Sequence, residues 1–252
     1  MRMYLVDAFT DTAFAGNPAG VVLLDAPADE AWMQRVAAEL KHSETAFVVP
    51  SGQPKSLRWF TPTTEVDLCG HATLATAHVL GGEQVFTTRS GELRCTAENG
   101  RVAMEFPADP PQPADVDVSA GLPGVVAEHV ARGVSDILVV LGDASEVRTV
   151  RPDLGVLAAL DARCVIVTAP GDHPGADFVS RVFGPAVGVP EDPVTGSAHC
   201  TLAPYWSARL GRTELTGEQA SARGGVVHTA LDGDRVRLSG SAVTVVEGEL
   251  LV

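Results

Sequence analysis

Short apolar runs separated by polar and turn-forming residues dominate the chain and predict a protein rich in β-strands. Several runs alternate apolar with polar residues, as strands with one buried face do. The predicted strands are Met3–Val6, Val21–Leu24, Thr45–Val49, Leu57–Phe60, Val102–Phe106, Ile137–Leu141, Cys164–Val167, Phe178–Phe183, Val226–Leu231, Arg235–Leu238 and Ala242–Val252.

Three other segments show helical patterns. In Asp29–Leu40 the apolar residues recur at helical spacing with charged residues on the opposite face, which predicts an amphipathic helix. Gly70–Leu80 and Gly196–Leu210 each begin at a glycine and consist largely of small and apolar residues, with almost no charge before their ends. A helix that is apolar nearly all round is usually buried, so we expect both to be enclosed by strands.

The two halves of the chain share an order of features that indicates an ancient duplication. Each half has a strand ending in Arg-x-Phe-x-Pro, then an acidic loop, then Gly-x-Ala at the start of a buried helix. In the first half these are Arg58–Pro62, Glu65 with Asp67, and Gly70–Ala72; in the second they are Arg181–Pro185, Glu191 with Asp192, and Gly196–Ala198.

The Pro-rich segment Pro107–Ala114 is the predicted linker between the halves, because proline cannot donate to a β-ladder. The predicted domains are residues 1–110, with a central helix near 70–80, and residues 111–252, with a central helix near 196–210. The last strand could return to the first domain. Two similar domains predict a ligand cleft between them.

The composition and net charge of the chain disfavour some classes of binding partner. The chain has 252 residues, 45% of them hydrophobic and 20% charged, and a net charge of −14, which disfavours nucleic acid and anionic membranes. No segment has the length of apolar residues needed to span a bilayer or the features of a signal peptide. Four scattered cysteines without CxxC pairing (Cys69, Cys95, Cys164 and Cys200) indicate reduced thiols and a cytoplasmic protein.

The glycine-led helix starts are candidate anion sites, because their first backbone N–H groups lack intrahelical partners and carry partial positive charge. Asp192, just before the second helix, could cap that helix, hold a substrate amine or hydroxyl, or orient another group. His71, the second residue of the first helix, is expected to be a neutral hydrogen-bonding partner, since a helix N-terminus lowers the proton affinity of histidine.

The sequence gives little support for a metal or cofactor site. Cys69-Gly-His71, His199-Cys200 and His42 offer nitrogen and sulfur ligands, but none has the spacing of HExxH or CxxC. No dinucleotide fingerprint, P-loop or GxSxG elbow is present. We therefore expect neither a metal nor an organic cofactor. Glu44, at the junction of the first helix and the next strand, is not singled out by spacing alone.

Seven motifs together resemble, in order and over essentially the whole chain, those of the PhzF family of phenazine-biosynthesis isomerases. They are Phe14-Ala-Gly-Asn-Pro18, His42-Ser-Glu-Thr45, Phe60-Thr-Pro62, Cys69-Gly-His-Ala-Thr-Leu-Ala75, Asp177-Phe-Val-Ser-Arg181, Glu191-Asp-Pro-Val-Thr-Gly-Ser-Ala-His199 and Ser221-Ala-Arg-Gly-Gly225. The resemblance implies an α+β fold like that of diaminopimelate epimerase: two similar domains, each a β-barrel-like sheet wrapped around a central helix. It also implies a homodimer without metal or organic cofactor.

The resemblance further implies site residues. Glu44 falls on the family's acid/base glutamate, and His71 and Asp192 are the other candidate catalytic residues. The candidate substrate-binding residues are Asn17, Ser43, Gly70, Gly196 and Ser197. The implied reaction is relocation of a proton on a small carboxylate-bearing metabolite.

Two other functions remain open. Related epimerases of this fold use two cysteines, one at each central helix; here Cys69 occupies the first position, but Thr195 stands where the second would be. A threonine hydroxyl is too weak an acid to be that base unaided, which favours proton transfer by Glu44 alone over racemisation. The third alternative is a non-catalytic protein that binds metabolites.

Overall fold

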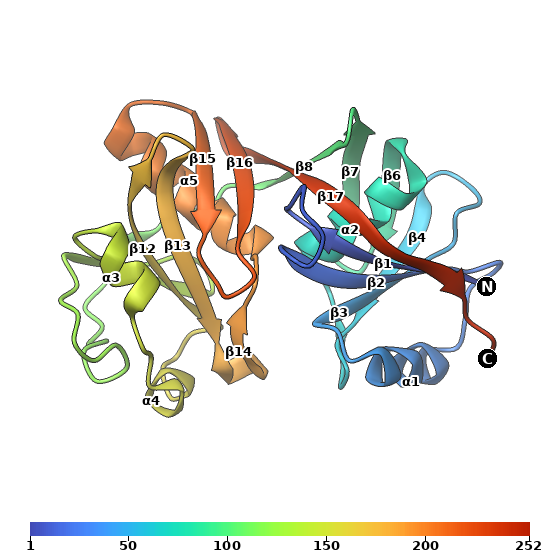
Figure 1. The fold of residues 1–252 in the computed structure, drawn as a ribbon, viewed down its shortest axis with the longest axis horizontal. Helices are drawn as coiled ribbons and strands as arrows, with labels where there is room; N and C mark the ends of the chain where they lie inside the picture. The colour runs from blue at the N-terminus through green and yellow to red at the C-terminus, as the bar shows by residue number, and fades with distance from the viewer. The chain divides into compact units, whose positions relative to one another are not determined.

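The computed structural model describes residues 1–252 and divides them into two compact units (Figure 1). Unit 1 consists of Met1–Glu105 and Ser239–Val252, and unit 2 of Phe106–Leu238. The sequence puts the boundary after residue 110, whereas the structure puts it inside strand β8, and most of the last strand belongs to unit 1.

Unit 1 is a strand-rich unit with two helices. Its elements are β1 (Arg2–Ala8), β2 (Asn17–Leu23), α1 (Glu30–Leu40), β3 (Glu44–Val48), β4 (Lys55–Phe60), β5 (Glu65–Val66), α2 (Gly70–Leu80), β6 (Gly82–Thr88), β7 (Gly91–Glu98) and β8 (Arg101–Pro107). The long strand β17 (Arg235–Glu249) leaves unit 2 and pairs antiparallel with β1, from Ala8 opposite Ala242 to Arg2 opposite Glu249. The end of the chain therefore completes the sheet that its beginning opens.

Unit 2 contains the elements between β8 and β17. They are β9 (Gln112–Pro113), β10 (His129–Arg132), β11 (Asp136–Val140), α3 (Ala144–Thr149), α4 (Leu154–Ala158), β12 (Cys164–His173), β13 (Ala176–Gly184), a 3₁₀ turn (Pro185–Val187), β14 (Val189–Asp192), α5 (Gly196–Leu210), β15 (Glu214–Gln219) and β16 (Gly225–Asp232). None of the helices in either unit is long and apolar enough to cross a membrane.

The two units repeat one topology. The strands flanking the first helical segment pair in parallel, β2 with β3 in unit 1 and β11 with β12 in unit 2. The strands flanking the central helix also pair in parallel, β4 with β6 and β13 with β15. The antiparallel pairs β1–β2, β3–β4 and β6–β7 have counterparts in β10–β11, β12–β13 and β15–β16. This correspondence supports the duplication inferred from the sequence.

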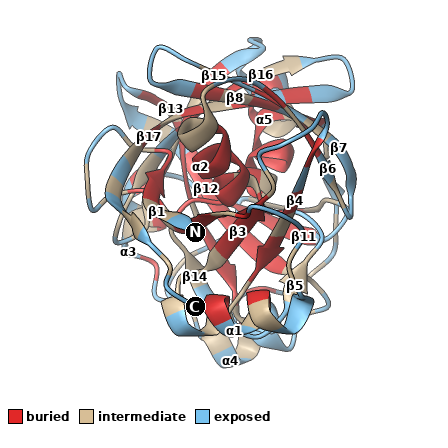
Figure 2. Ribbon diagram, turned by 90° about the vertical axis from the view of Figure 1, so that its right-hand side faces the viewer, coloured by how far each residue is buried: buried red, intermediate tan, exposed pale blue.

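The central helices α2 and α5 have the bounds that the sequence predicts, and both are buried (Figure 2). Every residue from His71 to Ala77 is buried in α2, and nine residues are buried in α5. Small side chains allow strands to approach from all sides; α2, for example, packs against β1, β2 and β3. The amphipathic helix is also confirmed: Asp29 is the N-cap of α1 and accepts a hydrogen bond from the Trp32 N–H.

Several elements carry no sequence signal. In β7 only Cys95 is buried, so hydrogen bonding to β6 and β8, rather than an apolar face, holds this strand. The helices α3 and α4 have six and five residues, too few to show a helical period. The predicted strands Arg235–Leu238 and Ala242–Val252 form the single strand β17, which continues through Gly240. A side chain at Gly240 would meet the Phe9 ring at 2.6 Å, so only glycine fits there.

The repeated Arg-x-Phe motif forms the same contact in both units. In unit 1 the Arg58 guanidinium donates from Nε and Nη2 to the two Glu65 carboxylate oxygens, at 2.6 and 2.7 Å. In unit 2 Arg181 does the same to Glu191, at 2.8 and 2.9 Å. Each guanidinium also lies over the phenylalanine two residues further on, at 5.2 and 4.9 Å from the ring centroid. Such bidentate pairs are strong, and here they tie the acidic loop to its strand.

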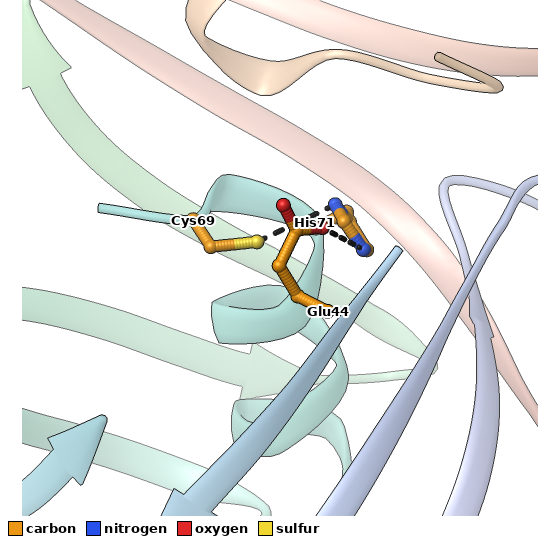
Figure 3. Close-up of side chains that lie close together, drawn as sticks. All are labelled: Glu44, Cys69 and His71. Atoms are coloured by element: carbon orange, nitrogen blue, oxygen red, sulfur yellow. Dashed lines mark hydrogen bonds and ion pairs between the residues drawn. The ribbon is translucent and has the colours of Figure 1, made fainter. Parts of the chain in front are cut away.

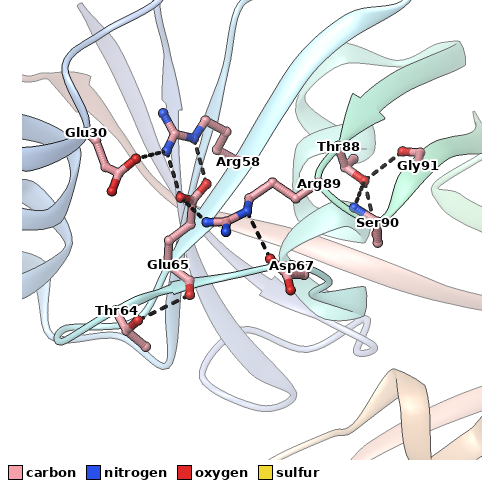
Figure 4. Close-up of polar contacts among 9 residues, drawn as sticks. All are labelled: Glu30, Arg58, Thr64, Glu65, Asp67, Thr88, Arg89, Ser90 and Gly91. Atoms are coloured by element: carbon pink, nitrogen blue, oxygen red, sulfur yellow. Dashed lines mark hydrogen bonds and ion pairs between the residues drawn. The ribbon is translucent and has the colours of Figure 1, made fainter.

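In unit 1 this pair is the centre of a larger network (Figure 4). Glu30 of α1 accepts from Arg58 at 2.6 Å, and Arg89 bridges Glu65 and Asp67 at 2.6 and 3.0 Å. The network therefore joins α1, β4 and the turn after β6 to the segment that leads into α2.

We expect Arg58→Met to destabilise the protein by about 3 kcal/mol, because it leaves the buried Glu65 carboxylate with a single partner. The matched control is Arg94→Met, which breaks the exposed pair with Glu92 and should change stability by less than about 0.5 kcal/mol. Urea unfolding measures both.

The pH dependence of this effect follows from the pKa of Glu65. Hydrogen bonding to Arg58 lowers that pKa below its usual value of 4.5, so the pair stabilises fully above about pH 4.5. The contribution is lost as the pH falls through the lower folded-state pKa. The difference between wild type and Arg58→Met should therefore shrink below pH 4; an equal difference at pH 3 and pH 7 would contradict this account.

Candidate active site

Three polar side chains meet where α2 begins (Figure 3). Glu44 is the first residue of β3, Cys69 is the N-cap of α2, and His71 is the second residue of that helix. The Glu44 Oε2 atom lies 3.4 Å from His71 Nε2, and the Cys69 sulfur lies 3.5 Å from His71 Nδ1. We call these residues, together with Gly70, the α2 start. Glu44 and His71, which the sequence selects, are thus in contact.

The side chain of the N-cap residue does not cap the first turn of α2. The backbone of Cys69 is extended, at φ −143° and ψ 111°, and its side chain does not cap the helix. The Thr73 hydroxyl donates back to the Cys69 carbonyl at 2.5 Å, which fixes the turn without using its N–H groups. The half-buried Gly70 presents no side chain there. The first N–H groups of α2 are therefore suited to stabilising negative charge.

Burial fixes the charge state of His71. Its side chain is only 5% exposed, and desolvation lowers the pKa of the imidazole to about 3. The sequence predicts a neutral histidine from the helix terminus; the structure confirms the neutral state but assigns it to burial. The Glu44 side chain is more accessible, at 17% exposed.

A neutral imidazole links its two neighbours. With the proton on Nε2 it faces the Glu44 carboxylate, and Nδ1 can accept from the Cys69 thiol; with the proton on Nδ1 the roles reverse. The 3.4 Å separation is long for an N–H···O bond, and Nε2 forms no well-aligned hydrogen bond. Catalytic hydrogen bonds often tighten only when substrate is bound.

The same three side chains are the better of two groups that could hold a metal ion, with ligand atoms within 4.8 Å of one another. Here, however, the carboxylate and the thiol lie beside opposite ring nitrogens of His71. Since one ion binds only one ring nitrogen, this geometry favours a hydrogen-bonded chain over chelation. In the other group (Asp172, His173 and Glu218) the Arg148 guanidinium already occupies both carboxylates.

The start of α5 is built differently. Thr195 is its N-cap, and the Thr195 hydroxyl donates to Asp192 Oδ2 at 2.6 Å. The Gln219 side chain accepts from the Thr195 N–H at 2.8 Å and donates to the Asp192 carbonyl at 2.7 Å. Of the alternatives left open for Asp192, this contact supports the orienting role, because the carboxylate accepts from the N-cap hydroxyl. Together with Gly196 and Ser197, Asp192 and Thr195 form what we call the α5 start.

The remaining predicted residues are placed as follows. Ser43 precedes β3 and Ser197 is the second residue of α5; both are half-buried, whereas Gly196 is buried. Asn17 begins β2 and is completely buried, and it follows Gly16, whose left-handed backbone and close approach to the Ala8 carbonyl exclude a side chain. The predicted substrate contacts of these residues stay predictions, as does the shared cleft.

Strand register shows which residues correspond between the two units. In unit 1 Phe60 lies opposite Thr45, and in unit 2 Phe183 lies opposite Val165. Because the two phenylalanines are equivalent, the residues one and two places before these partners correspond as well. Cys164 therefore takes the place of Glu44, and Arg163 that of Ser43.

At these corresponding positions the two helix starts carry chemically different groups. Burial, aided by the Asp136 charge, raises the pKa of the Cys164 thiol to about 12, so this group stays protonated at neutral pH. The α5 start thus has neither a carboxylate equivalent to Glu44 nor a thiol equivalent to Cys69. Sequence reasoning missed Arg163, which donates to the Ser197 hydroxyl at 2.9 Å, and Gln219; neither belongs to a recognisable motif.

The fold and the α2 start define the class of protein: a two-unit epimerase-like fold with a carboxylate and a neutral histidine at a buried helix start. The chain matches the model of the PhzC-PhzF family, described as phenazine biosynthesis-like protein, over residues 6–248. The chain therefore belongs to this family of PhzF-like isomerases.

Individual relatives support the same family assignment. The chain is 46% identical to an uncharacterized isomerase of Halalkalibacterium halodurans over 99% of this chain and 98% of the relative. It is similar to the crystal structure of a PhzF family protein from Enterococcus faecalis, with a TM-score of 0.95, 42% identity and coverage of 100% and 99%. A probable proline racemase from Agrobacterium radiobacter shares the fold alone, at 11% identity and a TM-score of 0.67 over 100% and 93% of the chains.

The low pKa of His71 predicts that its imidazole gains no proton between pH 5 and 8. Its ring carbon-bound proton, assigned by comparison with His71→Asn, should keep a constant NMR chemical shift over this range. In the unfolded chain the same group titrates near 6.5, so the protein should lose about 1.4 kcal/mol per pH unit from this residue as the pH falls below 6.5. A titration midpoint near 6.5 in the folded protein would refute the assignment.

Proposed function

We propose that this protein is a cofactor-independent isomerase that relocates a proton on a small carboxylate-bearing metabolite, with Glu44 as the single acid/base group. The observation that carries the proposal is the contact between the Glu44 carboxylate and a neutral, buried His71 beside the first turn of α2. Glu44 is ionised when it takes the proton from one carbon and protonated when it returns it to another.

His71 supports both steps without changing its charge. While Glu44 is ionised, an N–H on Nε2 can face the carboxylate; once Glu44 is protonated, its carbonyl oxygen can still accept from that N–H, so His71 keeps its proton throughout. The N–H groups in the first turn of α2 stabilise the negative charge that develops on a conjugated carboxylate as the proton leaves. At the α5 start, Asp192 orients the Thr195 hydroxyl.

The chemical difference between the two helix starts favours a single base over racemisation. Inverting a stereocentre with two bases needs an acid/base group on each face of the carbon. Of the groups discussed, the α2 start holds Glu44 and Cys69, whereas the equivalent positions at the α5 start hold the protonated Cys164 and the Thr195 hydroxyl, which donates to Asp192.

One screen separates the isomerase from the racemase and from a protein that only binds metabolites. Cyclic and amino-acid carboxylates are incubated with the protein in D2O and followed by NMR. An isomerase moves a double bond and incorporates deuterium, a racemase incorporates deuterium at an inverted stereocentre, and a binding protein incorporates none.

We also expect the protein to act as a homodimer in the cytoplasm, the former as the family resemblance implies. All four cysteines are free thiols, as is usual in a reducing compartment.

Glu44→Gln should lower turnover by roughly two to four orders of magnitude, the usual scale of general acid–base catalysis, because it removes the basic carboxylate but keeps the size of the side chain. Affinity for a carboxylate, measured by titration calorimetry, should stay nearly unchanged. Near wild-type deuterium exchange by Glu44→Gln would show that Glu44 is not the base.

Cys69→Ala should cost far less turnover than Glu44→Gln, about tenfold at most, because the thiol contacts Nδ1 of His71, the ring nitrogen that does not face Glu44. The two variants are compared on the same substrate by initial rates and by deuterium incorporation. Complete loss of turnover in Cys69→Ala, with fold and ligand affinity intact, would favour the racemase instead.

A further inference from the structure

Arg163 is a cation held at the start of α5. It lies directly before β12, and its Nε donates to Asp136 Oδ1 at 2.9 Å while Nη2 contacts Asp136 Oδ2. The same Nη2 donates to the Ser197 hydroxyl at 2.9 Å. The guanidinium therefore links two neighbouring parallel strands, β11 and β12, to the second residue of α5.

The Asp136 carboxylate acts as a support. Its side chain is 3% exposed, and it holds one edge of the guanidinium in a bidentate pair, the geometry that most restricts an arginine. The Arg163 side chain nevertheless stays 39% exposed. An arginine held on one edge and open on another is presented for binding, because its orientation is already fixed before a ligand arrives.

The second edge of the Arg163 guanidinium has N–H groups that are not used within the protein. Nε and Nη2 make all of the side-chain hydrogen bonds that Arg163 forms, so the two N–H groups of Nη1 donate to no protein acceptor. Asp136 and the nearby Asp192 together offset the charge of the guanidinium, and Asp192 is one of the groups that raise the pKa of Arg163. What the site offers a ligand is therefore directional hydrogen bonding from a cation rather than a strong long-range field.

Comparison of the two duplicated units shows how the α5 start differs from the α2 start. At the α2 start the carboxylate of Glu44 touches the second helix residue, His71; at the α5 start the guanidinium of Arg163 touches the second helix residue, Ser197. Strand register makes Arg163 and Cys164 the counterparts of Ser43 and Glu44. The cation of unit 2 therefore stands one residue before the position that corresponds to the carboxylate of unit 1.

We propose that Arg163, supported by Asp136 and joined by the Ser197 hydroxyl, is a binding site for a carboxylate at the α5 start. This inference goes beyond the proposed function, which concerns the α2 start. The N–H groups of Nη1 and the Ser197 hydroxyl can donate to the two oxygens of a planar carboxylate.

The test compares two probes of the same shape, cyclohex-1-ene-1-carboxylate and cyclohex-1-ene-1-carboxamide, whose dissociation constants are measured by calorimetry or ligand-observed NMR. Wild type should prefer the carboxylate by about tenfold, the difference between a charge-assisted and a neutral hydrogen-bonded contact. In Arg163→Gln the preference should fall close to one.

Because Arg163→Gln leaves the buried Asp136 carboxylate unpaired and could unfold the protein, the double variant Arg163→Gln/Asp136→Asn is measured beside it. This variant replaces the ion pair by two amides and should also lose the preference. The matched control is Arg132→Gln/Asp161→Asn, which neutralises an exposed pair in the same unit and should keep the preference.

Two results would overturn the proposal: a wild type that does not prefer the carboxylate, or a folded double variant that keeps the preference. Deuterium exchange with Glu44→Gln tests the proposed function separately, and this variant should retain the carboxylate preference. Loss of preference in the Arg163 variants with undiminished exchange in Glu44→Gln would uphold the binding site and reject the base. The opposite pair of results would uphold the base and reject the binding site.

Discussion

The structure of each unit depends on burying a helix made of small side chains. Burial of α2 requires strands on every side, so the unit must be built largely of strands, and the first turn of the helix is the place where a polar ligand can approach its backbone. The same burial strips water from His71 and keeps its imidazole neutral. Fold and chemistry thus share one cause: enclosing the helix creates both the core and the environment of the candidate acid/base pair.

Duplication supplied two such helix starts, and they have diverged in charge. The structural contacts are kept nearly unchanged: both units retain a bidentate arginine–glutamate pair with the arginine over a phenylalanine. In both helices the residue four places after the N-cap bonds back to the N-cap carbonyl, Thr73 in α2 and His199 in α5. The groups that differ are those beside the helix start.

The fold of this family is also found in a probable proline racemase at 11% identity, so the fold does not specify the reaction. The reaction depends on which groups stand at the two N-caps and at the strand ends beside them. In this chain a thiol stands at one N-cap and a hydroxyl at the other, and a carboxylate lies close to the thiol.

The sequence by itself determined the central helices, the amphipathic helix, the duplication and the family, because these depend on local composition, glycine starts and motifs read along the chain. It could not supply β7 or the short helices α3 and α4, whose residues lack a buried face or a full helical period. Only the tertiary structure showed that burial lowers the pKa of His71 and so keeps its imidazole neutral. Only the tertiary structure brings Arg163 into hydrogen-bonding contact with Ser197, 34 residues away in the sequence, and Gln219 with Thr195. The physical reason is that these contacts depend on strand register and on which surfaces exclude water, and both are set by hydrogen bonds between residues far apart in the sequence.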